Sequence, residues 1–598
     1  MGLLALAAVA LPAAAQPGAD GADIFAASCA TCHANPEFPD APQLALLREM
    51  QPGAIVNSLA NGIMQVQGSA LTDEAQIAVA EFIAGRPVDR TASFFVNRCQ
   101  RQTAITELSN ATDFNGWGNG IANARFAAQG GLTAADLPQL ELKWAFGYAK
   151  VESARAQPSY AGGRLFVASE NGEVHALDPA TGCTYWSFSA MSGVRTAIMV
   201  DAYTKPDGSE GFAAYFGDMS ANAYAVDANT GELIWVREID PHPSAAITGP
   251  PMVYDGRLYV PTQGLNEEGS GARGNYACCT FRGRLAALDA NTGELIWNSF
   301  TIDEPRPKAR NPAGDPLGWG PAGGGIWSPP TVDPERGLVY VATGNGYADP
   351  VQLTTDAIIA IDIETGAHRW VNQITPADQW AGGCGRGSAN NPACPAVMGP
   401  DHDFSSAPAM VRAGGRDLLV LPQKSGMAYA LDAGNDGELV WEYRLGEGVG
   451  LGGQWGPSLD GQNAYIGVAI MNAASPGGLH AIDLVTGEQV WHAQPEPLCA
   501  GAPGCRPSQG AATTVIPGAV FSGSLDGGMR AYSTEDGTVL WLFDTNREFA
   551  TVNGVAANGG GMDGPGAIVA GGMLFFNSGY GGFGRPAGNV LLAFGPAD

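Results

Sequence analysis

The chain has 598 residues, a formal net charge of −28 and ten cysteines. Because this length exceeds what one ordinary hydrophobic core supports, we expect one small and one large domain. The acidity argues against nucleic acid and anionic membrane surfaces as partners, since both require clustered Lys and Arg. Acidity either keeps the protein soluble or favours docking to a basic redox partner.

The first fifteen residues are apolar and end in three alanines. This stretch is too short to cross a bilayer and predicts a signal peptide over residues 1–15, although the usual basic residues ahead of the apolar part are missing. No later stretch is long and apolar enough for a membrane-spanning helix. An export signal together with ten cysteines predicts a periplasmic protein.

The next feature is Cys29-Ala-Thr-Cys32-His33. Two thiols at this spacing add to the vinyl groups of a c-type haem, and the adjacent imidazole binds its iron. A zinc knuckle or an isolated disulfide is the alternative, but residues 20–90 contain no other Cys or His. The motif therefore predicts covalent haem c and a role in electron transfer.

Residues 16–86 predict a compact, all-α cytochrome c domain. Thr72 is placed to cap a last helix that Gly85 ends. Met64, in a Gly-containing loop ahead of this helix, is the predicted sixth iron ligand, and Met50 is the second candidate. For either methionine the alternative is a role in core packing. Residues 87–113 are expected to form a linker.

From residue 175 onward one pattern recurs: a small or apolar residue, then Asp-x-x-Thr-Gly-x-x-x-Trp. It predicts a strand, a tight turn and a second strand ending in Trp, whose indole packs between neighbouring units. The copies end at Trp186, Trp235, Trp297, Trp370, Trp441, Trp491 and, with a changed turn, Trp541. Four-stranded units at this period stack radially as propeller blades.

The two ends of the repeat region determine the blade count. Residues 140–144 form an isolated strand ending in Trp144, and residues 589–594 form a C-terminal strand with no Trp after it. Pairing these two strands closes the ring and removes both exposed edges. We therefore predict an all-β, eight-bladed propeller over residues 114–598.

The cysteines outside the haem motif allow several pairings. Cys384 with Cys394, and Cys499 with Cys505, are close enough in sequence to bridge their own loops. Cys99 and Cys183 would then join the linker to the first repeat, although spacing alone does not prove it. The adjacent Cys278 and Cys279 either bond to each other or have separate partners.

Several segments fall outside the turn repeat: residues 115–119 with Arg125-Phe126, 193–196, 247–250, 278–283, 319–327, 423–426 and 563–566. Together with the propeller and the haem motif, they resemble the quinohaemoprotein alcohol dehydrogenases, which use pyrroloquinoline quinone (PQQ). The resemblance implies PQQ on the propeller axis and haem c as electron relay. It implies a soluble cytochrome c or similar external acceptor and a secondary alcohol substrate, polymeric or bulky, such as polyvinyl alcohol.

PQQ is a flat tricarboxylate, so its site needs cations and flat packing groups. The resemblance implies that the following residues bind it: Arg195, Thr248, Cys278, Cys279, Arg282, Trp327, Lys424 and Trp455. It places the disulfide ring of the adjacent cysteines on one face of PQQ and Trp327 on the other. The alternatives are solvated surface charges for the Arg and Lys residues and a core position for Trp327.

In related dehydrogenases the catalytic base is an Asp directly after the Trp of a Thr-Pro-x-Asp-x-Trp segment. Here residues 375–380 match that segment, but Ala381 follows. After an insertion, Asp403 restores the pattern and is the predicted base that removes the hydroxyl proton, with Asp401 second. The alternative for either aspartate is a turn-forming role.

The resemblance also implies a Ca²⁺ ion that polarises the quinone. Asn345 in Thr-Gly-Asn-Gly matches one ligand position. The register that aligns Arg282 puts Cys278 where the family has a ligand glutamate, so Glu267 and Glu268 are the substitute candidates.

Three other functions are compatible with parts of the sequence. One is a dehydrogenase for another primary, cyclic or sterol-like alcohol or an aldehyde. Another is a non-catalytic propeller scaffold, because outer-membrane assembly lipoproteins carry the same Trp turn, although these give no reason for the haem motif. The third is a haem electron shuttle whose propeller has lost PQQ.

Overall fold

A computed structural model describes residues 20–35, 41, 44–48, 52–60, 64–88, 97–109, 111–205, 207–265, 278–382, 384, 393–446, 455–469, 477–499, 508–581 and 586–597. Residues 1–15, Met50, Glu267, Glu268 and Cys505 lie outside this set. In the part of the chain described, no helix is both long and apolar enough to cross a membrane.

The N-terminal region is a small helical bundle. Its helices are α1 (Gly21–Ser28), α2 (Ala30–His33), α3 (Leu44–Leu47), α4 (Pro52–Ala60), α5 (Gln65–Gly68) and α6 (Asp73–Ala84). Thr72 caps α6 by accepting a hydrogen bond from Ala75 N at 3.3 Å, and Gly85 ends it with φ of 65°, as predicted. Helices α1 and α6 pack so closely that a Cβ at Gly21 would lie 2.0 Å from the Ala78 carbonyl oxygen.

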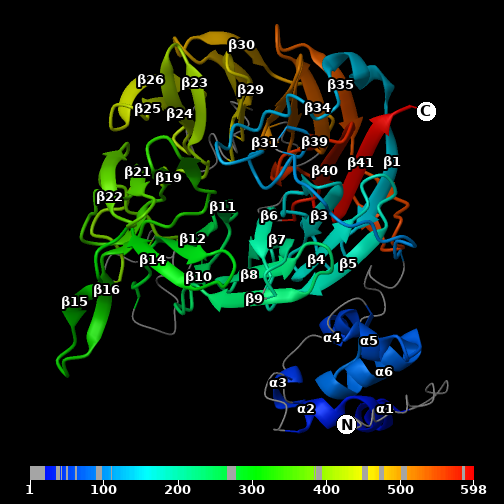
Figure 1. Cartoon of the computed structure of the whole chain (residues 1–598). Helices are drawn as coiled ribbons and strands as arrows, with labels where there is room; N and C mark the ends of the chain where they lie inside the picture. Colours follow the sequence, from blue (N-terminus) through cyan, green and yellow to red (C-terminus); the bar gives the residue numbers. More distant parts are fainter. Residues whose placement is uncertain are drawn as a thin grey trace, which may run out of the picture.

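The rest of the chain forms eight four-stranded blades around one axis (Figure 1). Blade 1 is β2 (Ser159–Ala161), β3 (Arg164–Ala168), β4 (Glu173–Leu177) and β5 (Thr184–Ser189). Blade 2 is β6 (Met199–Thr204), β7 (Glu210–Gly217), β8 (Asn222–Asp227) and β9 (Leu233–Glu238). Blade 3 is β11 (Met252–Tyr254), β12 (Arg257–Gly264), β13 (Arg284–Asp289) and β14 (Leu295–Phe300), with β10 (Ala245–Ala246) on the end of β12. Blade 4 is β18 (Thr331–Asp333), β19 (Leu338–Ala342), β21 (Ala357–Asp362) and β22 (His368–Gln373).

The second half of the ring repeats this order. Blade 5 is β23 (Ala409–Ala413), β24 (Arg416–Pro422), β25 (Met427–Asp432) and β26 (Glu438–Arg444). Blade 6 is β27 (Ser458–Leu459), β28 (Asn463–Val468), β29 (Gly478–Asp483) and β30 (Gln489–Ala493). Blade 7 is β32 (Thr514–Ile516), β33 (Ala519–Gly523), β34 (Gly528–Ser533) and β35 (Val539–Asp544). Blade 8 is β39 (Ile568–Ala570), β40 (Met573–Ser578), β41 (Val590–Pro596) and β1 (Leu140–Gly147).

Short elements decorate the blades. The 3-10 helix η1 (Ala134–Gln139) precedes β1, and β15 (Arg306–Arg310) with β16 (Pro316–Gly320) forms a hairpin that projects from the ring in Figure 1. The other short pairs are β17 (Ala322–Gly323) with β20 (Gly346–Ala348), β31 (Gly510–Ala511) with β38 (Asp563–Gly564), and β36 (Glu548–Phe549) with β37 (Ala557–Asn558).

The predicted closure of the ring is confirmed. Strand β1 pairs antiparallel with β41, which places Leu142 opposite Phe594 and Trp144 opposite Ala593. In Figure 1 the blue-cyan β1 and the red β41 accordingly lie side by side. Blade 8 is thus built from both ends of the propeller sequence, and the closed ring has no free sheet edge between its first and last blades.

The Trp turn works by the same contacts in successive blades, and blade 3 is representative. Trp235 of blade 2 donates its indole N–H to the Ala290 carbonyl at 2.9 Å. The Asp289 carboxylate accepts the backbone N–H groups that follow it, at 2.9 Å each. Gly293 has φ of 69°, and a Cβ there would lie 2.7 Å from the Trp235 ring. The glycine of the pattern is therefore required both by its backbone conformation and by the packing of the preceding blade.

Replacing Gly293 by Ala should lower the free energy of unfolding by about 2–4 kcal/mol, because left-handed backbone strain adds to overpacking against Trp235. Gly256 is a matched control in the same blade: its φ is also 69°, but a Cβ there would meet no atom within 4 Å. Gly256→Ala should cost only about 1 kcal/mol. Calorimetric melting of both variants checks this, and equal losses would show that the indole contact does not require glycine.

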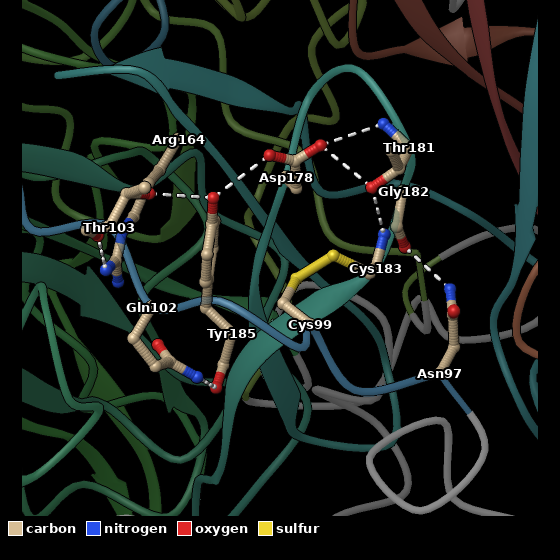
Figure 2. Close-up of a disulfide and its surroundings, with 10 residues drawn as sticks. All are labelled: Asn97, Cys99, Gln102, Thr103, Arg164, Asp178, Thr181, Gly182, Cys183 and Tyr185. Atoms are coloured by element: carbon tan, nitrogen blue, oxygen red, sulfur yellow. Dashed lines mark hydrogen bonds between the residues drawn. A yellow bond between two sulfur atoms is a disulfide. The ribbon is translucent and has the colours of Figure 1, made fainter.

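The segment after the helical bundle is fastened to blade 1 (Figure 2). Cys99 and Cys183 form a disulfide with a Cα–Cα distance of 5.0 Å, which confirms the sequence-based pairing. Thr184 N donates to the Asn97 carbonyl at 2.7 Å, and Cys99 N donates to the Thr184 carbonyl at 3.0 Å. The disulfide thus joins this segment to the first Trp turn, beside the Asp178 carboxylate. Figure 1 shows the bundle next to this blade, with α4 contacting β5.

The bonding states of the other described cysteines agree with the pairings predicted from the sequence. Cys384 and Cys394 are bonded to each other, and Cys499 is disulfide-bonded. Cys29 and Cys32 are the free thiols among the described cysteines. The two thiols of the haem motif are therefore available for thioether bonds to haem.

Candidate active site

A cavity lies on the propeller axis, next to the segments that precede the innermost strands of the blades. It is lined by Trp117, Arg155, Arg195, Thr248, Pro250, Trp327, Ser328, Pro329, Ser405, Trp455, Gly564 and Pro565. Seven blades contribute, because each lining segment after Trp117 lies just before the first strand of its own blade. We call this cavity the axial well. It brings together four residues predicted to bind PQQ: Arg195, Thr248, Trp327 and Trp455.

Flat and cationic groups meet in the axial well. The rings of Trp327 and Trp455 are perpendicular, with centroids 5.6 Å apart. The Arg195 guanidinium carbon lies 5.6 Å from the Trp455 ring, whose indole N–H donates to Asp563 Oδ1 at 2.6 Å. Arg155, which forms an ion pair with Glu170, adds a second cation. Burial and the neighbouring Arg155 charge lower the pKa of Arg195.

Among the described residues, three buried polar atoms of the axial well have no hydrogen-bond partner. They are Trp117 Nε1, Ser328 Oγ and Ser405 Oγ. Buried polar groups are normally satisfied, so such a group at a cavity wall indicates a polar ligand. Indole walls, two arginines and three unused polar atoms fit a flat, polyanionic quinone such as PQQ.

A second cluster contains the predicted base. Asp403 and Lys424 are both buried, and the Lys424 ammonium contacts Asp403 Oδ2 and lies 2.9 Å from Asp401 Oδ1. Asn345 N donates to Asp403 Oδ1 at 2.6 Å. The ammonium is also 5.2 Å from the centre of the Trp327 ring. Trp327 thus connects this cluster to the axial well, and one ammonium orients both candidate carboxylates.

Two further aspartates surround this cluster. Asp378 accepts His402 N at 2.7 Å and Asp401 N at 3.2 Å, which fixes the loop carrying Asp403. Burial raises the pKa of Asp378. Asp356 is fully buried with both carboxylate oxygens unpartnered, and burial together with the Asp403 charge raises its pKa well above the ordinary value. The environment of Asp356 therefore favours its neutral form, whereas Asp403 is held by the Lys424 ammonium.

The adjacent cysteines bond to each other, as one of the two sequence-based alternatives required. Both are buried, and Cys278 O accepts a hydrogen bond from Trp319 N at 3.0 Å. The disulfide packs in one hydrophobic cluster with Ile247, the residue before Thr248 of the axial well. Stacking of this ring on PQQ stays a prediction.

Arg282 is not brought into the axial well. Its Nε donates to the Ile302 carbonyl at 2.9 Å, and its guanidinium carbon lies 3.9 Å above the Phe300 ring of β14. These contacts hold the guanidinium against the blade 3 sheet, and Arg282 is not among the residues that line the axial well.

The described residues do not assemble a calcium site. The Asn345 side-chain amide donates to the Gly346 carbonyl at 2.8 Å and to the Trp380 carbonyl at 2.6 Å. Glu267 and Glu268 lie outside the described residues. Across the described ranges, no three His, Cys, Asp or Glu side chains converge as metal ligands.

The haem motif ends in α2, where His33 is buried. Burial, and next the neighbouring Cys32, raise the pKa of the Cys29 thiol. Met64 packs against the same hydrophobic core as Cys29, and its N–H donates to the Ser58 carbonyl at 3.1 Å. The short helix α5 separates Met64 from α6, whereas the sequence led us to expect Met64 directly before the last helix.

Sequence reasoning missed Trp117, Arg155, Ser328, Ser405 and Asp356. Arg155 carried a usable signal, because it is a loop arginine just before a strand, like Arg195. Trp117 lies in the segment 115–119 that falls outside the turn repeat. The two serines and Asp356 had no distinguishing pattern.

Both the propeller and the helical bundle are similar to known protein families. The model of the glucose/ethanol/alcohol dehydrogenase β-propeller domain matches residues 114–445. The model of cytochrome c oxidase cbb3-type subunit III matches residues 16–83, and that of outer membrane protein assembly factor BamB matches residues 424–561. The crystal structure of quinohemoprotein alcohol dehydrogenase from Comamonas testosteroni superposes with a TM-score of 0.60 at 19% identity, over 82% of each chain.

A closed eight-bladed ring with an axial well of indoles and arginines, joined to a cytochrome c domain, defines a quinohaemoprotein dehydrogenase. Polyvinylalcohol dehydrogenase of Pseudomonas sp. is 40% identical, covering 96% of this chain and 93% of its own. The Sphingopyxis sp. enzyme of the same name is 36% identical, covering 96% and 92%. The chain belongs to the PQQ-dependent alcohol dehydrogenase family, in the branch of these enzymes.

Proposed function

We propose that the protein is a periplasmic dehydrogenase that oxidises secondary alcohols, polyvinyl alcohol or similarly bulky ones, to ketones. Cys29, Cys32 and His33 would hold haem c, with Met64 as a further iron ligand, and the haem would relay electrons to a soluble cytochrome c. The observation that carries the proposal is the buried Asp403–Lys424 pair beside Trp327, at the wall of the axial well. The two relatives named polyvinylalcohol dehydrogenase support the substrate class.

Asp403 is the group we expect to accept the proton. Oxidation of a secondary alcohol removes the hydroxyl proton and transfers the carbinol hydrogen with its electron pair, leaving a ketone. Bound PQQ supplies the two-electron acceptor for that hydride. Lys424 and Asn345 N hold the two oxygens of Asp403, so the carboxylate is fixed before substrate arrives.

The remaining residues of the site are proposed to bind PQQ or to position the Lys424 ammonium. Arg155, Arg195, Trp327, Trp455 and Thr248 of the axial well would hold the cofactor, the arginines by charge and an indole by packing against its flat face. Cys278 and Cys279 are proposed as its second stacking face. Asp401 shares the Lys424 ammonium and is proposed to position it. The Ca²⁺ implied by the family has Asn345 as its one described candidate ligand, and no step above depends on it.

The proposed division of the chain is a signal peptide over 1–15, the cytochrome c domain over 16–86, a linker over 87–113 and the propeller over 114–598. The Cys99–Cys183 disulfide, which we call the tether, joins the proposed linker to blade 1 of the propeller. The nearest alternative is a dehydrogenase of the same family for another primary, cyclic or sterol-like alcohol or an aldehyde.

The test is a spectroscopic one on the full chain loaded with PQQ and Ca²⁺. Adding 2-butanol or polyvinyl alcohol should reduce haem c, with one ketone formed for every two electrons collected by an external cytochrome c. Protein without PQQ should give no reduction. Failure of all secondary alcohols to reduce the haem of PQQ-loaded protein would overturn the proposal, and preference for primary alcohols would favour the nearest alternative.

A further inference from the structure

Residues 114–130 cross the propeller beneath the axial well and touch the innermost part of seven blades. We call this segment the strap. It makes hydrogen bonds to seven blades, and one residue pair for each blade has a distance between 2.7 and 3.0 Å: Phe114 with Tyr160, Asn115 with Val200, Ile121 with Val332, Ala122 with Met410, Ala124 with Leu459, Ala127 with Val515 and Gly130 with Gly572. The strap therefore forms a floor under the cavity, and Trp117 is the residue it contributes to the lining.

Arg125 is the anchor of the strap and is fully buried. All its hydrogen bonds go to neutral acceptors: the carbonyls of Thr513, Trp117 and Ala567, the Gln157 amide oxygen at 2.7 Å and the Thr514 hydroxyl at 2.9 Å. No carboxylate among the described residues pairs with it. Burial lowers its pKa to about 9, so it carries a charge at neutral pH.

Arg125, a buried cation without a carboxylate partner among the described residues, contrasts with Arg530, which is also fully buried. Arg530 lies 2.9 Å from Asp526 Oδ2 inside blade 7, so its charge is neutralised there. A buried charge without a counter-ion costs several kcal/mol, which a protein normally avoids by pairing it. Arg125 has no carboxylate partner among the described residues, and Arg164, which is 2% exposed, likewise donates only to carbonyls. What distinguishes Arg125 is its place in the fold.

That place is directly behind the wall of the axial well. The guanidinium carbon lies 5.1 Å from the centre of the Trp117 ring. A Cβ at Gly456, next to Trp455, would be 3.8 Å from Arg125 Cδ, and one at Gly566, next to Pro565, would be 2.1 Å from Arg125 Nη2. The Arg125 side chain thus lies beside the lining residue Trp117 and beside the residues that follow Trp455 and Pro565 of the wall.

We propose that Arg125 is an electrostatic binding residue for the anionic cofactor, acting through the wall of the axial well rather than by direct contact. Its charge attracts the carboxylates of PQQ, and its hydrogen bond to the Trp117 carbonyl positions the unpartnered Trp117 N–H to donate to the cofactor. The inference rests on the proposed function, because it requires PQQ in the axial well.

Equilibrium titration of the cofactor-free full chain with PQQ, followed by quenching of tryptophan fluorescence, tests the proposal without turnover. Arg125→Gln should weaken PQQ binding by about tenfold or more, because a unit charge acting through protein at this range is worth that much. The matched control is Arg530→Gln, which removes an equally buried guanidinium that is paired with Asp526 and does not line the well. It should lower the melting temperature and leave PQQ affinity unchanged.

Arg125→Lys keeps the test decisive if the glutamine variant does not fold. A buried lysine has a lowered pKa, so its charge should disappear as pH rises from about 6 to about 8.5 and PQQ affinity should fall with it. Wild-type affinity should be flat over that range. Unchanged PQQ affinity in Arg125→Gln, or a flat profile in Arg125→Lys, would overturn the inference alone. Failure of the wild-type protein to bind PQQ would overturn the proposed function as well.

Discussion

Replacing Asp403 by Asn should lower kcat/KM for alcohol oxidation by about 10³-fold, within the range that positioned general bases contribute. The amide keeps the size of the carboxylate but does not accept the hydroxyl proton. PQQ content and the haem spectrum should be unchanged, because Asp403 touches Lys424 and Asn345 rather than the arginines of the axial well. Steady-state oxidation of 2-butanol with an external cytochrome c measures the loss.

Asp401→Asn is the matched control for this prediction. Asp401 lies 2.9 Å from the same Lys424 ammonium, so its loss perturbs the same cation without removing the proposed base. We expect less than about a tenfold effect, in line with a positioning role. If Asp401→Asn were the more damaging change, the base would be Asp401, and if neither variant lost activity, the proton would leave by another route.

The blades were predictable because each obeys one local rule. An Asp that accepts turn N–H groups, a glycine at positive φ and a Trp between blades recur at a fixed spacing, and the two unpaired strands at the ends then require closure through β1 and β41. Contacts of this kind recur at a fixed spacing in the sequence, so a periodic pattern predicts them. No sequence pattern predicted the short helix α5. This helix separates Met64 from α6, which Met64 was expected to precede directly.

The site was predictable only in part, and Arg282 shows why. A motif match identifies where a residue lies along the chain but not where its side chain points, and here Phe300 and the Ile302 carbonyl hold the guanidinium on the sheet. Arg155 and Trp117 were missed because the well is assembled from loops of seven blades and from the strap. The strap has no period, and its contacts join residues hundreds of positions apart, as between Ala127 and Val515.

Replacing Cys29 and Cys32 together by Ser should abolish covalent haem attachment and reduce electron delivery to external cytochrome c to background. Serine hydroxyls do not form the thioether bonds, and both thiols are free in the structure. The propeller should stay functional, because its ring closes through β1 and β41 without the helical bundle. Alcohol oxidation measured with a small two-electron dye should therefore persist in protein loaded with PQQ.

The control for this variant is Cys99→Ser with Cys183→Ser, which makes the same chemical change at the tether. That pair should keep covalent haem, seen as a haem-stained band under denaturing conditions, because these cysteines bond to each other and not to haem. Wild-type rates of cytochrome c reduction in the Cys29/Cys32 variant would show that electrons bypass haem c. Loss of both dye and cytochrome reduction would show instead that the haem domain is needed for alcohol oxidation itself.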